Sequence, residues 1–182
     1  MSHFLESTRI LLRPVQREDL KYLAELMSDR EIRILAGEVY PTTEKGMEEF
    51  YERCQKTEDR IWFMVIDKAT NRVIGETGFL RLFTPWRSTD FTVIIWDKEY
   101  WNKGYGKEIA GLMLDYGFNS LNIHRMGIGV VEFNKNALKF WKSIGFVEEG
   151  KQKDGYFVNG KYYDFIMMYL LEDDYRNKST MK

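Results

Sequence analysis

Residues 101–107 read WNKGYGK and combine two glycines with two lysines directly after an apolar segment. Glycine lets a backbone approach a ligand closely, and the free N–H groups and positive dipole end at a helix start favour a bound phosphate. Lys103 and Lys107 add positive charge. The segment predicts a pyrophosphate-binding loop, although an ordinary turn before a helix would look the same. It lacks the Lys-Ser/Thr ending of a Walker loop and the third glycine of the dinucleotide fingerprint.

A second segment, residues 134–146, reads NKNALKFWKSIGF. Asn134 is typical of a helix N-cap and Gly145 of a C-cap, and the apolar residues between them recur at helical spacing. By itself this segment indicates a helix that packs on a core.

The elements that must position these segments alternate between strand and helix patterns. Apolar spacings of three and four predict helices from Gln16, Thr43, Lys103 and Asn134, whereas residues 29–41 break the pattern. Short apolar runs predict strands at residues 9–15, 61–67, 72–82, 89–96, 124–131, 146–149 and 163–171, with a polar hairpin around Asn159 and Gly160. This order predicts a mixed α+β fold, a mostly antiparallel sheet of about seven strands covered by about four helices.

The chain is expected to form a single domain over residues 1–182, with its core at 7–172 and a polar C-terminal tail at 173–182. Its 27 Lys and Arg against 28 Asp and Glu give a net charge of −1, which argues against nucleic acid and anionic lipid as partners. One cysteine, Cys54, and two histidines, His3 and His124, argue against a disulfide or a metal site, and Cys54 is expected to fill the core. No apolar run of about 18 residues and no signal-peptide core is present, so a soluble, cytoplasmic protein is expected.

Taken together and in this order, the two segments resemble the GNAT superfamily of N-acetyltransferases. Members carry Q/R-x-x-G-x-G/A followed by N-x-x-A-x-x-x-Y-x-K-x-G-F, and the resemblance extends from the opening L-R-P to the last strand. The W-x-K-G-Y-G pattern is similar to the ribosomal-protein and spermidine branches, and residues 115–118 (DYGF) and 157–160 (FVNG) are most similar to the spermidine branch.

The resemblance implies acetyl-CoA as co-substrate, no metal, and a cofactor bound where two parallel neighbouring strands splay apart. It places the pyrophosphate on the glycine loop, at Asn102, Lys103, Gly104, Tyr105, Gly106 and Lys107. The strand end at Ile94, Ile95 and Trp96 would hydrogen-bond the pantetheine amides. Asn134 and Trp141 would reach the cofactor from the following helix, with capping as the larger role of Asn134.

Two positions depart from the family pattern. Trp101 replaces the usual Gln or Arg at the start of the loop, which leaves the backbone cradle intact. Trp141 replaces the tyrosine that protonates the departing thiolate in many members, and an indole N–H is too weak an acid for this step. Tyr105 and Tyr162 are possible replacements, and water is a third source of the proton.

Acetyl transfer needs a neutral amine and a stabilised oxyanion, so a carboxylate base and N–H donors are expected. Asp90, in a strand pattern where relatives carry an acid, is the first candidate for base or substrate anchor, and Glu76 is the second. Either could instead be a solvated strand residue. Backbone N–H groups near Ile95 would meet the oxyanion.

Charge also differs along the chain, because residues 28–59 hold nine acids and five bases whereas residues 102–143 hold three acids and six bases. The basic part would face CoA phosphates and the acidic part a cationic amine, although surface helices often carry mixed charge. Tyr40, Phe83, Trp86 and Tyr156 could line the acceptor site. The resulting hypothesis is an acetyl-CoA-dependent N-acetyltransferase of a primary amine, with a polyamine ahead of a protein N-terminus, and with a possible homodimer. The alternative is a non-catalytic acyl-CoA-binding or regulatory module.

Overall fold

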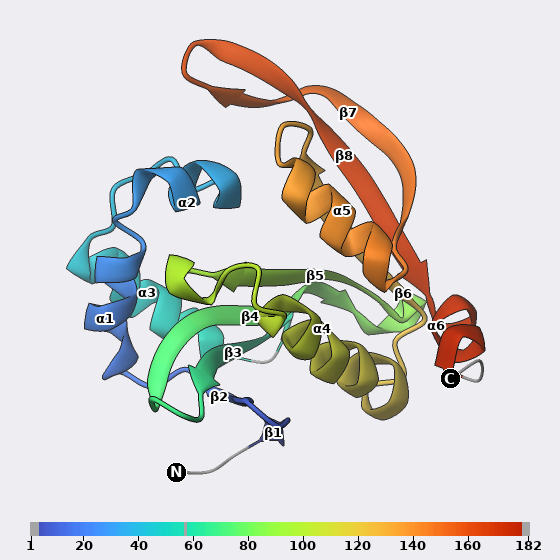
Figure 1. Cartoon of the computed structure of the whole chain (residues 1–182), viewed down its shortest axis with the longest axis horizontal. Helices are drawn as coiled ribbons and strands as arrows, with labels where there is room; N and C mark the ends of the chain where they lie inside the picture. Colours follow the sequence, from blue (N-terminus) through green and yellow to red (C-terminus); the bar gives the residue numbers. More distant parts are fainter. Residues whose placement is uncertain (1–3, 57, 180–182) are drawn as a thin grey trace.

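The computed structural model describes residues 4–56 and 58–179, and these form one continuous eight-stranded sheet with helices on both faces (Figure 1). The strands are β1 (Leu5–Glu6), β2 (Ile10–Pro14), β3 (Arg60–Asp67), β4 (Arg72–Phe83), β5 (Ser88–Ile95), β6 (Arg125–Val131), β7 (Val147–Val158) and β8 (Lys161–Leu171). The helices are α1 (Asp19–Leu26), α2 (Arg30–Ala36), α3 (Glu44–Cys54), α4 (Tyr105–Asp115), α5 (Lys135–Ile144) and α6 (Glu172–Ser179). The predicted mixed α+β fold is confirmed.

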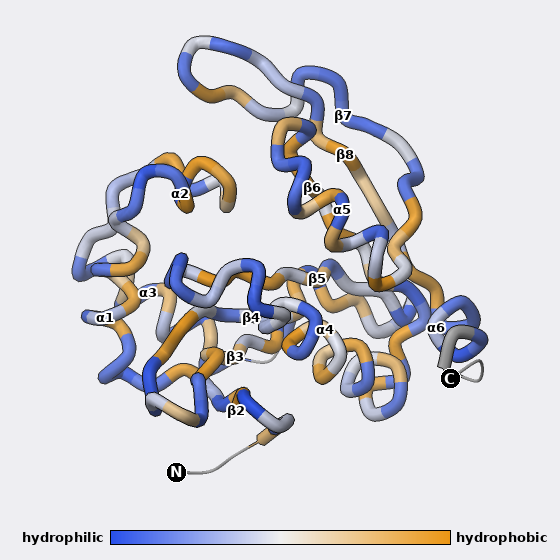
Figure 2. The backbone as a smooth tube through the Cα atoms, in the orientation of Figure 1, coloured by the Kyte–Doolittle hydropathy of each residue, from blue (hydrophilic) through white to orange (hydrophobic). Residues whose placement is uncertain are grey.

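The strand order is β1-β2-β3-β4-β5-β6-β8-β7, and every pair is antiparallel except β5–β6. The β7–β8 hairpin turns at Asn159 and Gly160, where the sequence predicted a hairpin, and both residues adopt positive φ. Figure 2 shows β7 largely in hydrophilic colours, as expected of an edge strand exposed along most of its length.

Alternation along the central strands builds two apolar layers. In β2, Ile10 and Leu12 pack with α4 and α5, whereas Leu11 packs with α1 to α3 on the other face. In β3, Phe63 and Met64 divide between the two layers in the same way. A strand buried on both faces reads as a continuous apolar run, which is why these segments were recognisable in the sequence.

Three elements correct the sequence prediction. Residues 29–41 were expected to break the helical pattern, but they contain α2, because Asp29 caps its Glu31 and Ile32 N–H groups and Gly37 ends it at φ 83°. The segment expected to be a polar tail forms the helix α6, whose Glu172 binds Arg87, and residues 180–182 lie outside the described part. The third element is the short strand β1.

The strand expected at residues 146–149 also extends much further, to Val158. Register shifts between Glu148 and Gly150 and between Gln152 and Tyr156 interrupt its apolar alternation. Such bulges break the alternation of apolar and polar residues by which a strand is predicted, because the side chains beyond each bulge switch to the other face of the sheet.

Candidate active site

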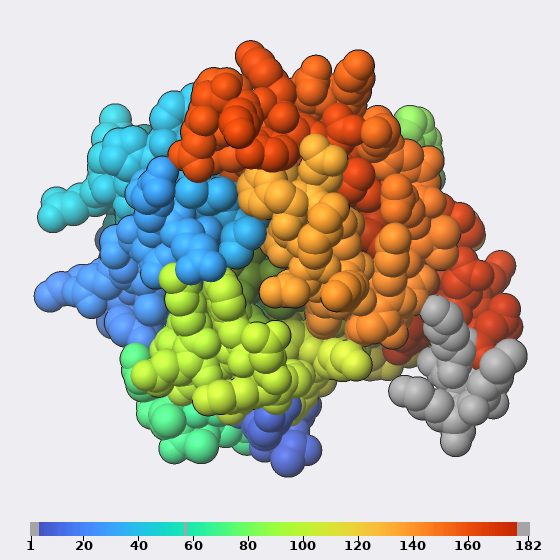
Figure 3. All heavy atoms as spheres, turned by 45° about the horizontal axis from the view of Figure 1, so that its top comes forward, coloured from blue at the N-terminus to red at the C-terminus, as the bar shows by residue number. Residues whose placement is uncertain are grey.

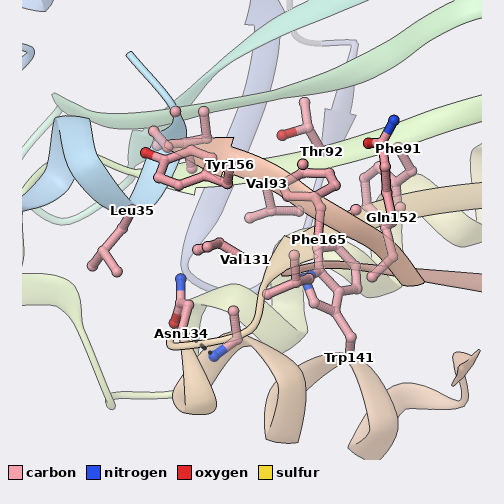
Figure 4. Close-up of a pocket in the computed structure, with 18 residues that line it drawn as sticks. Leu35, Phe91, Thr92, Val93, Val131, Asn134, Trp141, Gln152, Tyr156 and Phe165 are labelled. Carbon is pink, nitrogen blue, oxygen red and sulfur yellow. Dashed lines mark hydrogen bonds between the residues drawn. The ribbon is translucent and has the colours of Figure 1, made fainter. Parts of the chain in front are cut away.

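The parallel strands β5 and β6 separate soon after they meet. They pair only at Ser88, Thr89 and Asp90, opposite residues 125–127, and no further pairing joins them in the described structure. The gap holds a cavity of about 400 Å³. Its walls come from β5, β6, α5, the end of α2 and the β7–β8 hairpin, with Phe91, Val93, Val131, Trp141, Tyr156 and Phe165 among the lining residues (Figure 4). The predicted splayed strand pair is confirmed.

Along β5, the backbone N–H and C=O groups of every second residue point into this gap. The N–H of Trp96 donates to Ile74 O at 3.0 Å, and the Ile94 carbonyl lies against Gly75 in β4. Backbone groups of successive strand residues point to opposite edges, so Val93 and Ile95 face the gap. The indole of Trp101 donates to Ile95 O at 2.8 Å and thereby fixes the end of this edge.

Of residues 94–96, only Ile95 directs its backbone groups toward the open edge of β5, so its hydrogen bond to pantetheine stays a prediction. Ile94 lines the cavity, but its peptide faces β4. Trp96 is buried in the layer under α1 to α3 and its N–H is already used. Val93 was missed because sequence gives the residues of a strand but not which edge is open.

The glycine loop enters α4 with an exposed cradle. Asn102 and Gly104 adopt φ of 58° and 85°, and the first helical bond runs from Glu108 N to Gly104 O. The N–H groups of residues 104–107 consequently have no partner within the helix, which is the arrangement that binds phosphate. The side chains of Lys103 and Lys107 are exposed. In Figure 3 the surface is hollowed between this segment in yellow-green, α2 in blue and α5 in gold.

Lys107→Glu is expected to weaken CoA binding about tenfold. The change places a negative charge in the first turn of α4, the helix whose N-terminus is expected to hold the phosphates. Lys107 is exposed, so the fold is retained. Titration of CoA into the Lys107→Glu variant measures the loss, which is expected to shrink as salt is added. Lys21→Glu, an equal change on the exposed face of α1, is the control. Equal affinity in the two variants would place the phosphates elsewhere.

Asn134 and Trp141 reach the cavity from α5. The side-chain oxygen of Asn134 accepts from Ala137 N at 3.1 Å, as a cap should, while its amide nitrogen points toward the cavity (Figure 4). Trp141 packs edge-on against Phe91, Phe140 and Phe146 and lines the cavity with one face. Asn134 and Trp141 therefore both line the cavity in which the cofactor is expected to bind.

The two tyrosines considered as proton donors lie outside the cavity lining. Tyr105 donates its hydroxyl to the buried Asp67 Oδ1 at 2.9 Å, and its pKa is raised by burial and by that carboxylate. Tyr162 is 65% exposed and packs on Phe157 near the hairpin tip. Neither arrangement places a phenol at the splayed strands.

The two candidate carboxylates also lie apart from the cavity lining. Asp90 is at the closed end of the parallel pair, ion-paired with Arg81. Glu76 is buried and accepts from Trp62 Nε1 at 3.1 Å, and burial raises its pKa to about 7. That pKa suits a general base, but the contacts of Glu76 are with Trp62 and the layer under α1 to α3.

Of the four aromatic residues expected around the acceptor, only Tyr156 lines the cavity, with its hydroxyl donating to Ile34 O in α2. Tyr40 and Trp86 are 81% and 76% exposed, and Phe83 packs on Trp86. The sequence missed the contribution of α2, whose Leu35, Ala36 and Gly37 close one side. The Asp29 cap and Gly37 were the available signal.

The other candidate groups considered in the described part of the chain do not form a second catalytic or metal site. Burial raises the pKa of Cys54 to about 12, as expected of a core thiol. In residues 4–56 and 58–179, no group of three or more His, Cys, Asp or Glu is arranged to hold a metal ion. Over the same residues, no helix has the length and apolar character that a membrane crossing requires. His3 lies outside the described part.

Comparison with known proteins adds independent evidence. The acetyltransferase (GNAT) domain family matches residues 9–147. The spermidine N(1)-acetyltransferase of Vibrio cholerae serotype O1 is 31% identical over 173 residues, which cover 95% of this chain and 99% of that protein. The spermidine N(1)-acetyltransferase of Escherichia coli K12 is 28% identical, with 91% and 88% covered.

Among solved structures, spermidine N-acetyltransferase from Vibrio cholerae in complex with CoA and spermine superposes with a TM-score of 0.85 at 30% identity, covering 94% of this chain and all of that one. Fold, splayed strands, glycine loop and full-length similarity thus agree. This chain belongs to the GNAT acetyltransferase family and is an acetyl-CoA-dependent N-acetyltransferase.

Proposed function

We propose that this enzyme acetylates a primary amine of a polyamine such as spermidine or spermine. The observation that carries the proposal is similarity over nearly the whole chain to spermidine N-acetyltransferases, one of them solved with CoA and spermine. Charge near the cavity supports it. Glu38 directly follows the cavity residue Gly37, is exposed, and acts electrostatically on Tyr156. Within residues 4–56 and 58–179 no basic side chain is ion-paired with Glu38, and a carboxylate in this position attracts a second ammonium group of the acceptor.

In this proposal the chain binds acetyl-CoA along its splayed edge. The N–H groups at the start of α4 and the side chains of Lys103 and Lys107 hold the diphosphate. The pantetheine arm follows β5, where the peptide groups of Val93 and Ile95 face the gap, and one of these N–H groups meets the developing oxyanion. Alignment of the thioester with the amine supplies much of the acceleration, because the two reactants are held side by side.

Proton transfer from the ammonium is assigned to solvent. Asp90 is paired with Arg81, and Glu76 is enclosed beside Trp62, so both carboxylates are committed to contacts away from the cavity lining. The hollow between the glycine-loop segment, α2 and α5 in Figure 3 gives water access to this part of the site. Water therefore accepts the proton before the amine attacks the thioester carbonyl.

The departing sulfur is stabilised by the indole N–H of Trp141, which donates a hydrogen bond without transferring the proton. We expect Trp141→Phe to lower kcat about tenfold, because it keeps a ring against Phe91 and Phe146 but removes the donor. Trp141→Tyr should stay within about threefold of the unaltered enzyme, since a phenol O–H also donates a hydrogen bond to the sulfur. Steady-state release of CoA measures both. An unchanged kcat in Trp141→Phe would mean that water, and not the indole N–H, donates the hydrogen bond to the departing sulfur.

An amine panel tests the acceptor. Thiol release from acetyl-CoA is compared for spermidine, spermine, monoamines of equal length and peptides with free N-termini. Higher kcat/KM for polyamines than for monoamines supports the proposal, and Glu38→Gln should reduce that preference. Preference for peptides would assign the second candidate, a protein N-terminal amine. Binding of CoA without turnover of any amine would contradict an amine acetyltransferase and favour a regulatory module.

The proposal includes one domain over the whole chain, a homodimer and a cytoplasmic location. Sedimentation or light scattering of the purified protein, with and without spermidine, measures the oligomeric state. A monomer at micromolar concentration in both conditions would contradict the dimer.

A further inference from the structure

An arginine near the start of the chain contacts the glycine loop. Arg9, next to the first residue of β2, donates through Nη1 to Lys103 O at 3.0 Å, and its guanidinium lies 4.3 Å from the centre of the Tyr105 ring. A Cβ built on Gly104 would lie 3.4 Å from Arg9 Nη2. Arg9 therefore contacts Lys103 and Tyr105 and lies beside Gly104, which stands between them.

The same arginine neutralises an acid in the first turn of α4. Glu108 Oε2 accepts from Arg9 Nε at 2.7 Å, and Glu108 Oε1 accepts from Arg9 N at 2.9 Å and from Ser7 Oγ. These hydrogen bonds hold the pKa of Glu108 below its usual range although burial acts against them, so the carboxylate is charged at neutral pH. A negative charge at this helix end would repel a diphosphate unless it is compensated.

We infer that Arg9 is a positioning residue of the acetyl-CoA site. It draws the Lys103 carbonyl toward β2, which keeps the N–H groups of residues 104–107 directed at the opposite side, and it cancels the Glu108 charge. Asn102 adopts a left-handed φ of 58°, a conformation that a non-glycine residue keeps only where the surrounding structure holds it. Nothing in the loop sequence indicates this role, because Arg9 and Lys103 are 94 residues apart.

The chain offers a closely matched control. Arg87 likewise binds a backbone carbonyl, Asn122 O at 2.7 Å, and a glutamate, Glu172 Oε2 at 2.7 Å. Side-chain exposure is 41% and 17% in the Arg9–Glu108 pair and 41% and 16% in the Arg87–Glu172 pair. The two arginines differ in that only Arg9 contacts the phosphate loop, so a comparison separates positioning from general stabilisation.

The test is direct titration of CoA into purified Arg9→Ala, Arg87→Ala and the unaltered protein, with kcat and KM for acetyl-CoA measured alongside. We expect Arg9→Ala to raise the Kd for CoA and the KM for acetyl-CoA about tenfold with kcat within about twofold, and Arg87→Ala to leave both near their original values. Arg9→Lys should recover part of the affinity by restoring charge. Adding Glu108→Gln to Arg9→Ala should recover about threefold, because it removes the uncompensated carboxylate.

Equal Kd values for Arg9→Ala and Arg87→Ala, or a loss confined to kcat, would overturn the inference. If Arg9→Ala does not fold, the same comparison is made between Arg9→Lys and Arg87→Lys, where no increase in Kd for Arg9→Lys would overturn it. The inference rests on the proposed cofactor loop. CoA binding by the unaltered protein tests that loop separately, and no amine is needed in either titration.

Discussion

We expect Gly104→Val to bind CoA about 100-fold more weakly than the unaltered protein. Gly104 adopts φ 85° at the start of α4, a left-handed conformation that costs a β-branched residue about 1–2 kcal/mol. Valine relieves this strain by moving to negative φ, which turns the N–H groups of residues 104 and 105 away from the diphosphate. Loss of two charge-assisted hydrogen bonds of about 1.5 kcal/mol each corresponds to roughly the stated factor.

Gly160→Val is the matched control for that variant. Gly160 has nearly the same backbone conformation, φ 78°, at the tip of the β7–β8 hairpin, and a Cβ there meets no heavy atom within 4 Å. Both variants should therefore lose similar thermal stability, through strain or through the backbone change that relieves it, while only Gly104→Val loses CoA affinity. Calorimetric titration gives the affinities and thermal unfolding gives the stabilities. Unchanged CoA binding by Gly104→Val, or an equal loss of affinity in Gly160→Val, would show that the backbone N–H groups at the start of α4 do not bind the diphosphate.

The second large effect is on the pH dependence of stability and comes from Glu76. Burial raises its pKa from 4.5 to about 7, so the folded protein keeps a proton that the unfolded chain releases. The folded state then binds more protons between these two values, and the free energy of unfolding falls as pH rises through that window and levels off above it. A shift of this size corresponds to a loss on the order of 3 kcal/mol.

Glu76→Gln should remove most of this slope, because glutamine does not ionise and its side-chain oxygen can still accept from Trp62 Nε1. Carboxyls held at lowered pKa, such as Asp67 and Asp164, stay ionised throughout the window and add no slope there. Urea unfolding at pH 5 and pH 8 measures the difference for each protein. The exposed Glu58→Gln is the control and should keep the original slope. A slope unchanged in Glu76→Gln would show that Glu76 is already ionised in the folded state.

The two residues in these predictions lie on opposite faces of the sheet. Gly104 belongs to the face with α4 and α5, where the cofactor loop begins, and Glu76 belongs to the layer beneath α1 to α3. A variant on one face is therefore expected to leave the property of the other unchanged, so CoA affinity measured in Glu76→Gln serves as a further check.

Local signals in the sequence were sufficient for most elements. The loop glycines, the Asn134 cap and the Gly145 stop each act within a few residues, so they indicate the start of α4 and both ends of α5 directly. The two-sided apolar runs of β2 and β3 likewise follow from burial on both faces. Where local signals conflicted, prediction failed: α2 is short and capped by Asp29, and β7 changes face at its bulges.

By itself, the sequence determined the fold class, the order of most of its elements, the family resemblance and the segment expected to hold a diphosphate, because these depend on periodicity and on neighbours along the chain. The tertiary structure alone decided which edge of β5 is open, that Trp96 and Glu76 are enclosed while Tyr156 borders the cavity, and that Arg9 contacts Lys103. These facts depend on pairing and packing between segments tens of residues apart, and residue type and spacing carry no information about which distant segment a side chain will meet.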